Sequence, residues 1–266
     1  MLNTDFELDQ KSISRLASSG LGADVLKSQL QCGLDTSLEM WKSQGLNIIK
    51  NRGYFYFDTK FIPIEEAEFC IVDIETNGSK VQKHQIIEIA AVKVKNGVIT
   101  ASFESLVKCD EINEHIVQLT GISVQDTQHA PNPKDVLKKF KLFLGDAIFI
   151  AHDVKFDYKF ISDSLEKFGL EPLLNRSLCS LALAERTLTS YRYALSYLND
   201  YFDLYPEATH HRAMSDVLTT YELFKLSLQN GSENMNNVED LIKFSKEAKR
   251  LKRPKFNPLL KEEKEE

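Results

Sequence analysis

The spacing of hydrophobic and polar positions changes along the chain and separates it into three parts. In the first part, residues 1–66, apolar positions such as Val25, Leu26 and Leu30 recur at helical spacing, and Gly45 is a helix-ending residue. The segment NIIKNRGYFYFDTKFIPI that follows combines aromatic and β-branched residues with turn formers, which predicts a hairpin of two strands. Short helices followed by a hairpin indicate a small N-terminal extension, either a winged-helix-like module or a simple packing extension.

The second part, residues 67–229, has the pattern of an α/β domain. FCIVDIE and QIIEIAAVKVKNGVITASFESLV predict a meander of three strands, the last two joined by an Asn-Gly turn. PKDVLKKFKLFLG predicts an amphipathic helix, AIFIAH a short buried strand and FDYKFISDSLEKFG another helix, and further helices are expected up to residue 229. Antiparallel strands followed by alternating helices and strands predict a mixed sheet flanked by helices.

The third part, residues 230–266, is polar and ends in KFSKEAKRLKRPKF followed, near the terminus, by KEEKEE. Such a composition predicts a flexible tail, which either keeps the chain soluble or binds a partner.

Composition and charge narrow the class of protein. A chain of 266 residues with 42% hydrophobic residues can bury a full core. No run approaches the roughly 20 apolar residues of a membrane helix, and MLNTDFELDQ does not resemble a signal peptide, so we expect a cytoplasmic protein with no membrane contact. The four cysteines are far apart, which suggests neither a zinc site nor a disulfide framework. The net charge of −6 argues against a broad basic surface for nucleic acid, but not against a nucleic-acid substrate held through metal ions.

The first candidate for chemistry is a pair of carboxylates. Asp73 and Glu75 end the apolar run FCIVDIE, and their spacing of two residues places both side chains on one face of a strand. Two neighbouring carboxylates beside an apolar strand repel each other, and a shared divalent cation relieves that repulsion. Polar residues also begin at strand ends for structural reasons alone, so this pair does not by itself identify a metal site.

Two later segments carry the other candidates. In AHDVKFDYKF a strand ends at His152, Asp153 can cap the following helix, and Asp157 lies near the first turn, where acidic residues are favoured in any case. In HRAMSD, His211 and Asp216 are five residues apart, which is the wrong spacing for one helical face. We therefore expect His211 in the loop before a helix and Asp216 on that helix, with both side chains facing one cleft.

Together, these segments resemble the three motifs of the DEDDh, or DnaQ-like, family of 3′–5′ exonucleases, which includes the proofreading epsilon subunit of bacterial DNA polymerase III. The matching segments are DIET at 73–76, HDVKFD at 152–157 and HRAMSD at 211–216, the last of which follows the family pattern H-x-A-x-x-D. The resemblance spans about residues 68–228, and QIIEIAAV and LTGIS are similar to the family's connecting sequence. Asp153 stands where many members have asparagine, and its extra negative charge could weaken binding of the phosphate strand.

The resemblance implies an RNase H-like fold whose site binds two Mg²⁺ or Mn²⁺ ions. Asp73, Glu75 and Asp216 would surround one ion. Asp73 would also touch the second ion, which Asp157 would support through water. In such a site one cation generates hydroxide from water and the other stabilises charge on the departing 3′ oxygen. His211 is the implied general base, because a neutral imidazole can accept the proton of that water.

Four more residues near the first motif are expected to contact the substrate or to support the site. The backbones of Thr76, Asn77 and Gly78 are expected to contact the terminal nucleotide, although the conformational freedom of Gly78 equally explains a plain turn. Glu88 in IIEIAAV is expected to be structural or to support the site from outside it.

These observations predict a two-metal-ion 3′–5′ exonuclease that releases 5′-mononucleotides from DNA 3′ ends, single-stranded or frayed, and that proofreads for a replicative DNA polymerase. An RNA-trimming exoribonuclease would use the same residues, and nothing in the motifs separates the two substrates. The N-terminal extension and the polar tail favour association with a polymerase subunit, because both can dock partners. A catalytically inactive nuclease fold that serves as an interaction module is disfavoured, because all five chemical positions are present.

Overall fold

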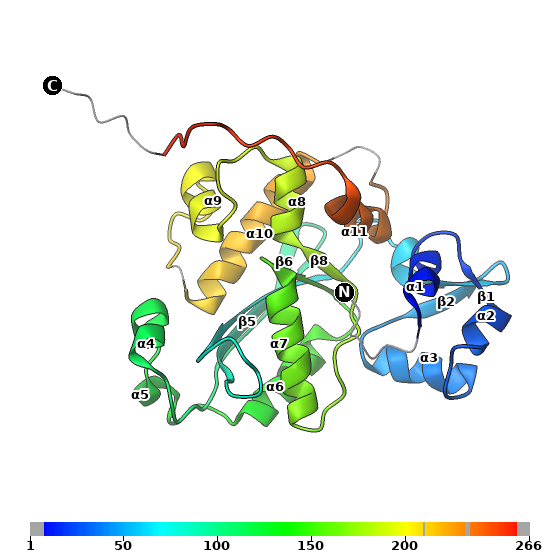
Figure 1. Ribbon diagram of the computed structural model, residues 1–266, viewed down its shortest axis with the longest axis horizontal. Coiled ribbons are helices and arrows are strands. Elements are labelled where there is room, and N and C mark those ends of the chain that lie inside the picture. The colour runs from blue at the N-terminus through cyan, green and yellow to red at the C-terminus, as the bar shows by residue number, and fades with distance from the viewer. Residues whose placement is uncertain (1–7, 210, 232–234, 260–266) are drawn as a thin grey trace.

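A five-stranded mixed sheet forms the centre of the protein (Figure 1), seen in a computed structural model that describes residues 8–209, 211–231 and 235–259. The strand order is β6-β5-β4-β7-β8, with β4, β5 and β6 antiparallel and with β7 and β8 parallel to β4. The strands are β4 (Phe69–Thr76), β5 (Ile86–Lys95), β6 (Val98–Leu106), β7 (Ile148–Ala151) and β8 (Ser177–Cys179). The predicted mixed sheet is therefore confirmed.

The meander and its turn follow the sequence pattern closely. Asn96 and Gly97 between β5 and β6 have φ values of 52° and 72°, and positive φ at both central positions is what a two-residue hairpin requires. The strand β8 was not anticipated from the sequence, because three residues are too few to show a periodic pattern.

Helices cover both faces of the sheet. α6 and α7 pack on the face that presents Cys70, Val72 and Ile74 of β4, and α8, α10 and α11 pack on the face that presents Phe69 and Ile71. α9 packs outside α8 and α10, and α4 packs through Ile116 in a small cluster with Ile87 at the start of β5. Their bounds are α4 (Glu114–Thr120), α5 (Val124–Thr127), α6 (Pro133–Leu144), α7 (Val154–Lys167), α8 (Ser180–Thr187), α9 (Leu195–Phe202), α10 (Ala213–Gln229) and α11 (Val238–Glu247). Among the described residues, no helix is both long enough and apolar enough to cross a bilayer.

The N-terminal extension is a small unit with its own core and a three-stranded antiparallel sheet in the order β1-β3-β2. Its elements are α1 (Gln10–Leu16), β1 (Leu21–Gly22), α2 (Ala23–Lys27), α3 (Leu34–Ser43), β2 (Ile48–Asn51), β3 (Tyr54–Phe57) and a 3₁₀ turn, η1 (Asp58–Lys60). The helices and the hairpin agree with the sequence pattern, and the two-residue strand β1 was not anticipated. The winged-helix interpretation of this unit stays a prediction.

Specific contacts hold this N-terminal unit against the α/β domain. Leu174 inserts into the core of the unit, and the Arg176 guanidinium lies 4.4 Å from the centre of the Phe57 ring. Arg176 also donates two hydrogen bonds to the Glu239 carboxylate, to which Thr59 donates a third of 2.6 Å. Because Glu239 belongs to α11, the two ends of the chain are joined at one buried charged group.

The structure corrects the expectation of a flexible tail from residue 230 onward. Residues 238–247 form α11, and Val238, Leu241 and Ile242 of this helix are buried against the sheet. The helix is amphipathic, so the average composition of the segment is polar although three of its residues belong to the core. Residues 260–266, which include KEEKEE, lie outside the described residues.

We expect Leu241→Ala to lower the free energy of unfolding by about 3 kcal/mol, because Leu241 is fully buried and its loss leaves a cavity. Leu142→Ala is the matched control, since Leu142 is a helical leucine that is 84% exposed. Urea denaturation measures both changes. Equal, small losses in the two variants would mean that α11 is not part of the folded core.

Candidate active site

Two carboxylates project from the end of β4 on the face covered by α10. Asp73 and Glu75 continue the alternation begun by Phe69 and Ile71, so both share that face, as their spacing predicted. Burial raises the pKa of Asp73 well above its usual range, and the carboxylates of Asp157 and Asp216 raise it further. Burial, followed by the carboxylates of Asp216 and Glu88, raises the pKa of Glu75 to about 8.

A third carboxylate reaches the same place from α7. Asp157 lies in the first turn of that helix and is only 4% exposed. Burial raises the pKa of Asp157 to about 7, although the backbone N–H groups of Asp157 and Ile74 act in the opposite direction.

Asp153 occupies the position before α7 but does not cap the helix as predicted. Its φ of 67° and ψ of 59° are left-handed, and its side chain accepts no capping hydrogen bond. A capping side chain normally requires an extended backbone at this position, which explains the difference.

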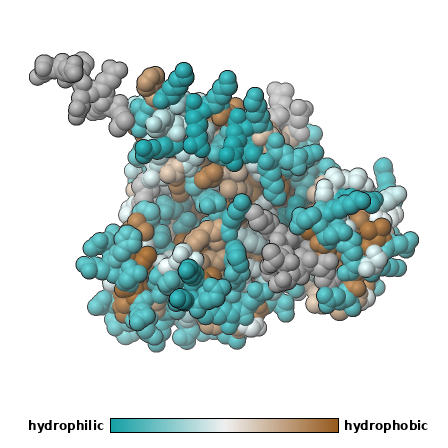
Figure 2. All heavy atoms as spheres, in the orientation of Figure 1, coloured by the Kyte–Doolittle hydropathy of each residue, from teal (hydrophilic) through white to brown (hydrophobic). Residues whose placement is uncertain are grey.

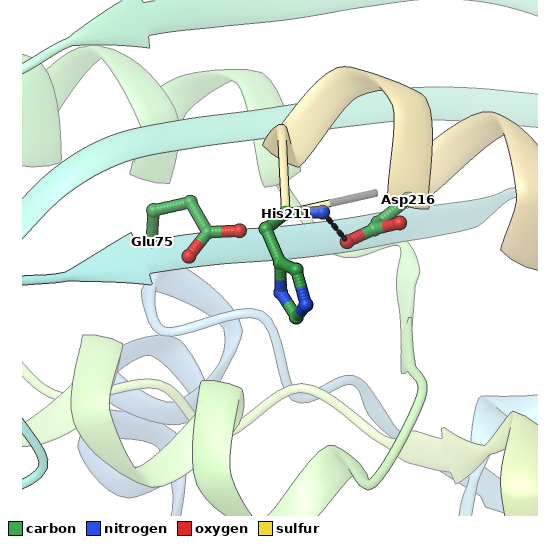
Figure 3. A group of neighbouring side chains, drawn as sticks. All are labelled: Glu75, His211 and Asp216. Carbon is green, nitrogen blue, oxygen red and sulfur yellow. Dashed lines mark hydrogen bonds between the residues drawn. The ribbon is translucent and has the colours of Figure 1, made fainter. Parts of the chain in front are cut away.

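The fourth carboxylate and the histidine come from the start of α10. His211 lies in the turn before Ala213, with a φ of 62°, and its backbone N–H donates a 3.1 Å hydrogen bond to Oδ2 of Asp216 (Figure 3). Glu75, His211 and Asp216 each offer a ligand atom, and these atoms all lie within 4.8 Å of one another. The imidazole is exposed, whereas Asp216 is partly buried. The expected arrangement, with the histidine in the loop and the aspartate on the helix, is therefore confirmed.

Glu88 supports the site from outside it, as expected from its position in the sequence. It lies directly opposite Glu75 in the β4–β5 ladder and is 1% exposed. The Arg212 guanidinium donates a 2.8 Å hydrogen bond to Glu88, and the Ala213 backbone N–H donates another of 2.9 Å. Because Arg212 and Ala213 follow His211 directly, the carboxylate of Glu88 fixes the turn that carries the histidine. A lone glutamate inside an apolar strand was the available signal for this role.

The three residues predicted to contact the substrate have different surroundings. Thr76 is the last residue of β4. The Asn77 side chain connects loop segments, because it donates a 2.8 Å hydrogen bond to the Glu111 carbonyl and accepts one of 2.7 Å from the Gln85 N–H. Gly78 has a φ of 153°, and a Cβ there would lie 2.6 Å from the ring of His84. Local structure thus already accounts for Asn77 and Gly78, and substrate contact by all three residues stays a prediction.

The donor set fits divalent cations. Carboxylate oxygens are the ligands that Mg²⁺ and Mn²⁺ prefer, and imidazole nitrogen is a further possible ligand for Mn²⁺. Four carboxylates approach from β4, α7 and α10. Burial is the main cause of the raised pKa values of Asp73 and Glu75, and repulsion by the neighbouring carboxylates raises both values further. Cations bound among these oxygens would offset that repulsion.

These pKa values predict how the stability of the metal-free protein depends on pH. The ordinary values are 4.5 for Glu75 and 3.8 for Asp157, and the folded values are about 8 and about 7. An acid with a raised folded pKa stabilises the fold fully below its unfolded pKa, and this stabilisation is lost as the pH rises through the folded pKa. In EDTA, the melting temperature should therefore fall between about pH 4.5 and pH 8.

Addition of Mg²⁺ should reduce that fall, because the cation takes the place of the protons. Differential scanning fluorimetry across the pH range measures both effects, and the double variant Asp73→Asn/Glu75→Gln should show a flatter profile in EDTA. A melting temperature that stays constant or rises over this range in the wild-type protein would contradict the assignment.

We expect Arg212→Met to lower the free energy of unfolding by about 3 kcal/mol, because the buried Glu88 carboxylate loses its cation. Lys159→Met breaks an exposed ion pair with Asp163 and should cost less than about 1 kcal/mol. Chemical denaturation of the two variants compares the pairs. A loss in Arg212→Met no greater than that in the control would show that the Glu88 pair does not hold the turn.

The sequence of this chain is similar to those of known proteins. Residues 70–224 match the exonuclease family named RNase T, and these residues are more than half of the chain. The chain is 37% identical over 182 residues to the PolC-type DNA polymerase III of Staphylococcus haemolyticus, and 33% identical over 191 residues to that of Halalkalibacterium halodurans. These alignments include 67% and 70% of the chain, but only 12% and 13% of the polymerases.

Solved structures share the fold. Escherichia coli exonuclease I in complex with a dA16 oligonucleotide superposes with a TM-score of 0.56 at 17% identity, over 62% of this chain and 41% of that one. Exonuclease X in complex with 5′ overhanging duplex DNA superposes with a TM-score of 0.52 at 23% identity, over 65% of this chain and 99% of that one. The resemblance inferred from the three motifs is confirmed, and the chain belongs to the exonuclease family.

Proposed function

We propose that the chain is a 3′–5′ exonuclease that depends on divalent metal ions and releases 5′-mononucleotides from DNA 3′ ends. The observation that carries the proposal is the proximity of Glu75, His211 and Asp216, which come from two elements far apart in the sequence and whose ligand atoms lie within 4.8 Å of one another. Asp73 lies close to this group and to Asp157. Burial raises the pKa of Asp73, and the carboxylates of Asp157, Asp216 and Glu75 raise it further.

Four carboxylates would hold two Mg²⁺ or Mn²⁺ ions. Asp73, Glu75 and Asp216 are the proposed ligands of one ion, and Asp73 and Asp157 those of the other. Bound there, the ions would lower the pKa of water and neutralise charge on the scissile phosphate. Asp157 is buried and the other three carboxylates are half-buried, which restricts their motion. Two divalent ions would neutralise the four negative charges held there.

His211 is the proposed general base. Its imidazole is exposed at the open side of the carboxylate group, where an incoming strand end can reach it. It would take the proton from the attacking water while the bond between phosphorus and the 3′ oxygen breaks, leaving the phosphate on the released nucleotide. The Glu88–Arg212 pair and the hydrogen bond from the His211 N–H to Asp216 would hold the backbone of this residue in place.

DNA is the proposed substrate because the relatives that align over two thirds of the chain are DNA polymerases, and because solved structures of the same fold contain DNA oligonucleotides. We further propose that the chain acts on primer ends made by a replicative DNA polymerase. The part of each PolC-type polymerase that aligns is a small fraction of its length.

We expect the protein with Mg²⁺ to shorten a 5′-labelled oligonucleotide stepwise and to release the label of a 3′-labelled one at once as a mononucleotide. Asp216→Asn should abolish the reaction, because it removes a negative ligand while keeping the side-chain shape. His211→Ala should lower kcat by about 10²- to 10⁴-fold, the usual contribution of a general base. Gel analysis of timed reactions measures polarity and rate together.

Asp163→Asn and His129→Ala are matched controls, because both side chains lie outside the site, and both variants should retain the wild-type rate. Parallel reactions with a mispaired DNA primer and with an RNA strand of the same sequence determine the sugar preference, and we expect DNA to be cut faster. Release of label from the 5′ end first, or full activity in Asp216→Asn, would refute the proposal.

A further inference from the structure

A short basic segment crosses the surface of the α/β domain outside the proposed active site. Residues 249–255, here called the basic strap, have the sequence KRLKRPK, which contains five cations and no acidic residue. All five cationic side chains are exposed. The chain as a whole has a net charge of −6, so this segment is a local concentration of positive charge, which attracts anionic partners.

The basic strap is held in one place. The Leu251 backbone N–H donates a 2.8 Å hydrogen bond to the Glu185 carbonyl on α8. The Glu185 side chain, only 5% exposed, lies 2.9 Å from Arg250 and 3.0 Å from Arg253. A buried carboxylate that receives two arginines fixes the course of the backbone, so the cations of the strap form a surface of defined shape.

The charge of the basic strap is largely uncompensated. Glu185 is its ion-pair partner within the described ranges, and one carboxylate faces five cations. Lys249, Lys252 and Lys255 form no ion pair with any residue that the structure describes. Arg186, next to Glu185 on α8, adds a further cation and donates to the Lys246 and Ala248 carbonyls just before the strap.

Aromatic rings lie beside these cations. The Arg253 guanidinium is 5.0 Å from the centre of the Tyr193 ring. Tyr197 and Tyr201 stack on α9 with 6.1 Å between ring centres, and the Tyr197 hydroxyl donates to Asn257 just after the strap. Phe256 is 84% exposed. Surfaces that bind single-stranded nucleic acid combine basic side chains, which contact the phosphate backbone, with aromatic rings, on which the bases stack.

The basic strap is connected to the proposed active site through the loop before α9. The Tyr193 carbonyl lies 2.8 Å from Nε2 of His152, which follows β7 and precedes the helix that carries Asp157. α9 also packs against α10, which carries Asp216. In Figure 1 the red C-terminal segment runs across α8 toward α9, and Figure 2 shows hydrophilic side chains along this rim of the molecule.

We propose that the basic strap, together with Tyr197 and Tyr201, is an accessory surface that binds single-stranded nucleic acid upstream of the 3′ end. The upstream placement rests on the proposed exonuclease function, whereas the binding itself does not. A strand whose 3′ end enters an acidic site extends away from it over the surrounding surface, and a fixed basic surface along that path would retain the strand between successive cuts.

Binding can be measured apart from hydrolysis. In EDTA the carboxylates of the active site repel a phosphate strand, so the affinity that remains reports on other surfaces. We expect the full chain to bind a fluorescent DNA strand of about 20 nucleotides, a length that covers an accessory surface, by fluorescence anisotropy. The triple variant Lys249→Ala/Lys252→Ala/Lys255→Ala should bind about tenfold more weakly at low salt, and the slope of log affinity against log salt should decrease by about 2.

These three lysines are chosen because they make no ion pair with Glu185, so the fold should persist, as the melting temperature will show. The matched control removes three exposed lysines of the N-terminal unit, Lys11, Lys27 and Lys42, and should bind like the wild-type protein. With Mg²⁺ present, the triple variant should lose more activity on long strands than on a dinucleotide.

Unchanged affinity and salt slope in the triple variant would overturn the proposal. Equally tight binding of a polyglutamate peptide of the same charge would also overturn it, in favour of an acidic protein partner. Binding that depends on the basic strap without any hydrolysis in Mg²⁺ would support the strap while refuting the exonuclease function, so the two failures are distinguishable.

Discussion

Mutual repulsion among buried and half-buried carboxylates determines how the site is built. Asp73 and Glu75 share one face of β4, and Glu88 stands directly opposite Glu75 on β5. The chain relieves part of this repulsion with its own groups. Arg212 pairs with Glu88, and the other two carboxylates, Asp157 and Asp216, lie in the first turns of α7 and α10, where the helix dipole favours negative charge. Burial and the repulsion that remains still raise the pKa values of Asp73 and Glu75, and divalent cations bound among these oxygens would offset both effects.

The fold supports this concentration of charge by burying both faces of the sheet. β4 occupies the centre, between the antiparallel β5 and the parallel β7, so its end is the point where helices from both faces converge. α7 follows β7 directly and delivers Asp157 to that end, while α10 crosses the opposite face and delivers Asp216. The same sheet face is completed by α11, whose Glu239 also receives Arg176 and the N-terminal unit. The two ends of the chain therefore contribute to the scaffold on which the site is built.

Much of this arrangement could be predicted from the sequence, because it depends on local periodicity. The spacing of Asp73 and Glu75, and the placement of His211 before its helix, followed from strand and helix geometry, and the Asn-Gly turn fixed the hairpin. The remaining features depend on contacts between distant segments. Glu88 and Arg212 are 124 positions apart, so their pairing has no local signature. α11 was interpreted as tail because its three buried apolar residues stand among charged ones, and Asp153 was expected to cap a helix although its backbone is left-handed. The sequence showed the cations of the basic strap, but not the buried Glu185 that fixes them.

Calorimetric titration with Mn²⁺ near pH 7, in two buffers of different ionisation enthalpy, tests whether these carboxylates form a site for divalent cations. Carboxylates with raised pKa values are partly protonated at that pH, so cation binding must displace protons. The proposed site predicts saturable binding accompanied by proton release, with both signals greatly reduced in Asp73→Asn. Absence of binding, or binding without proton release that persists in Asp73→Asn, would contradict it.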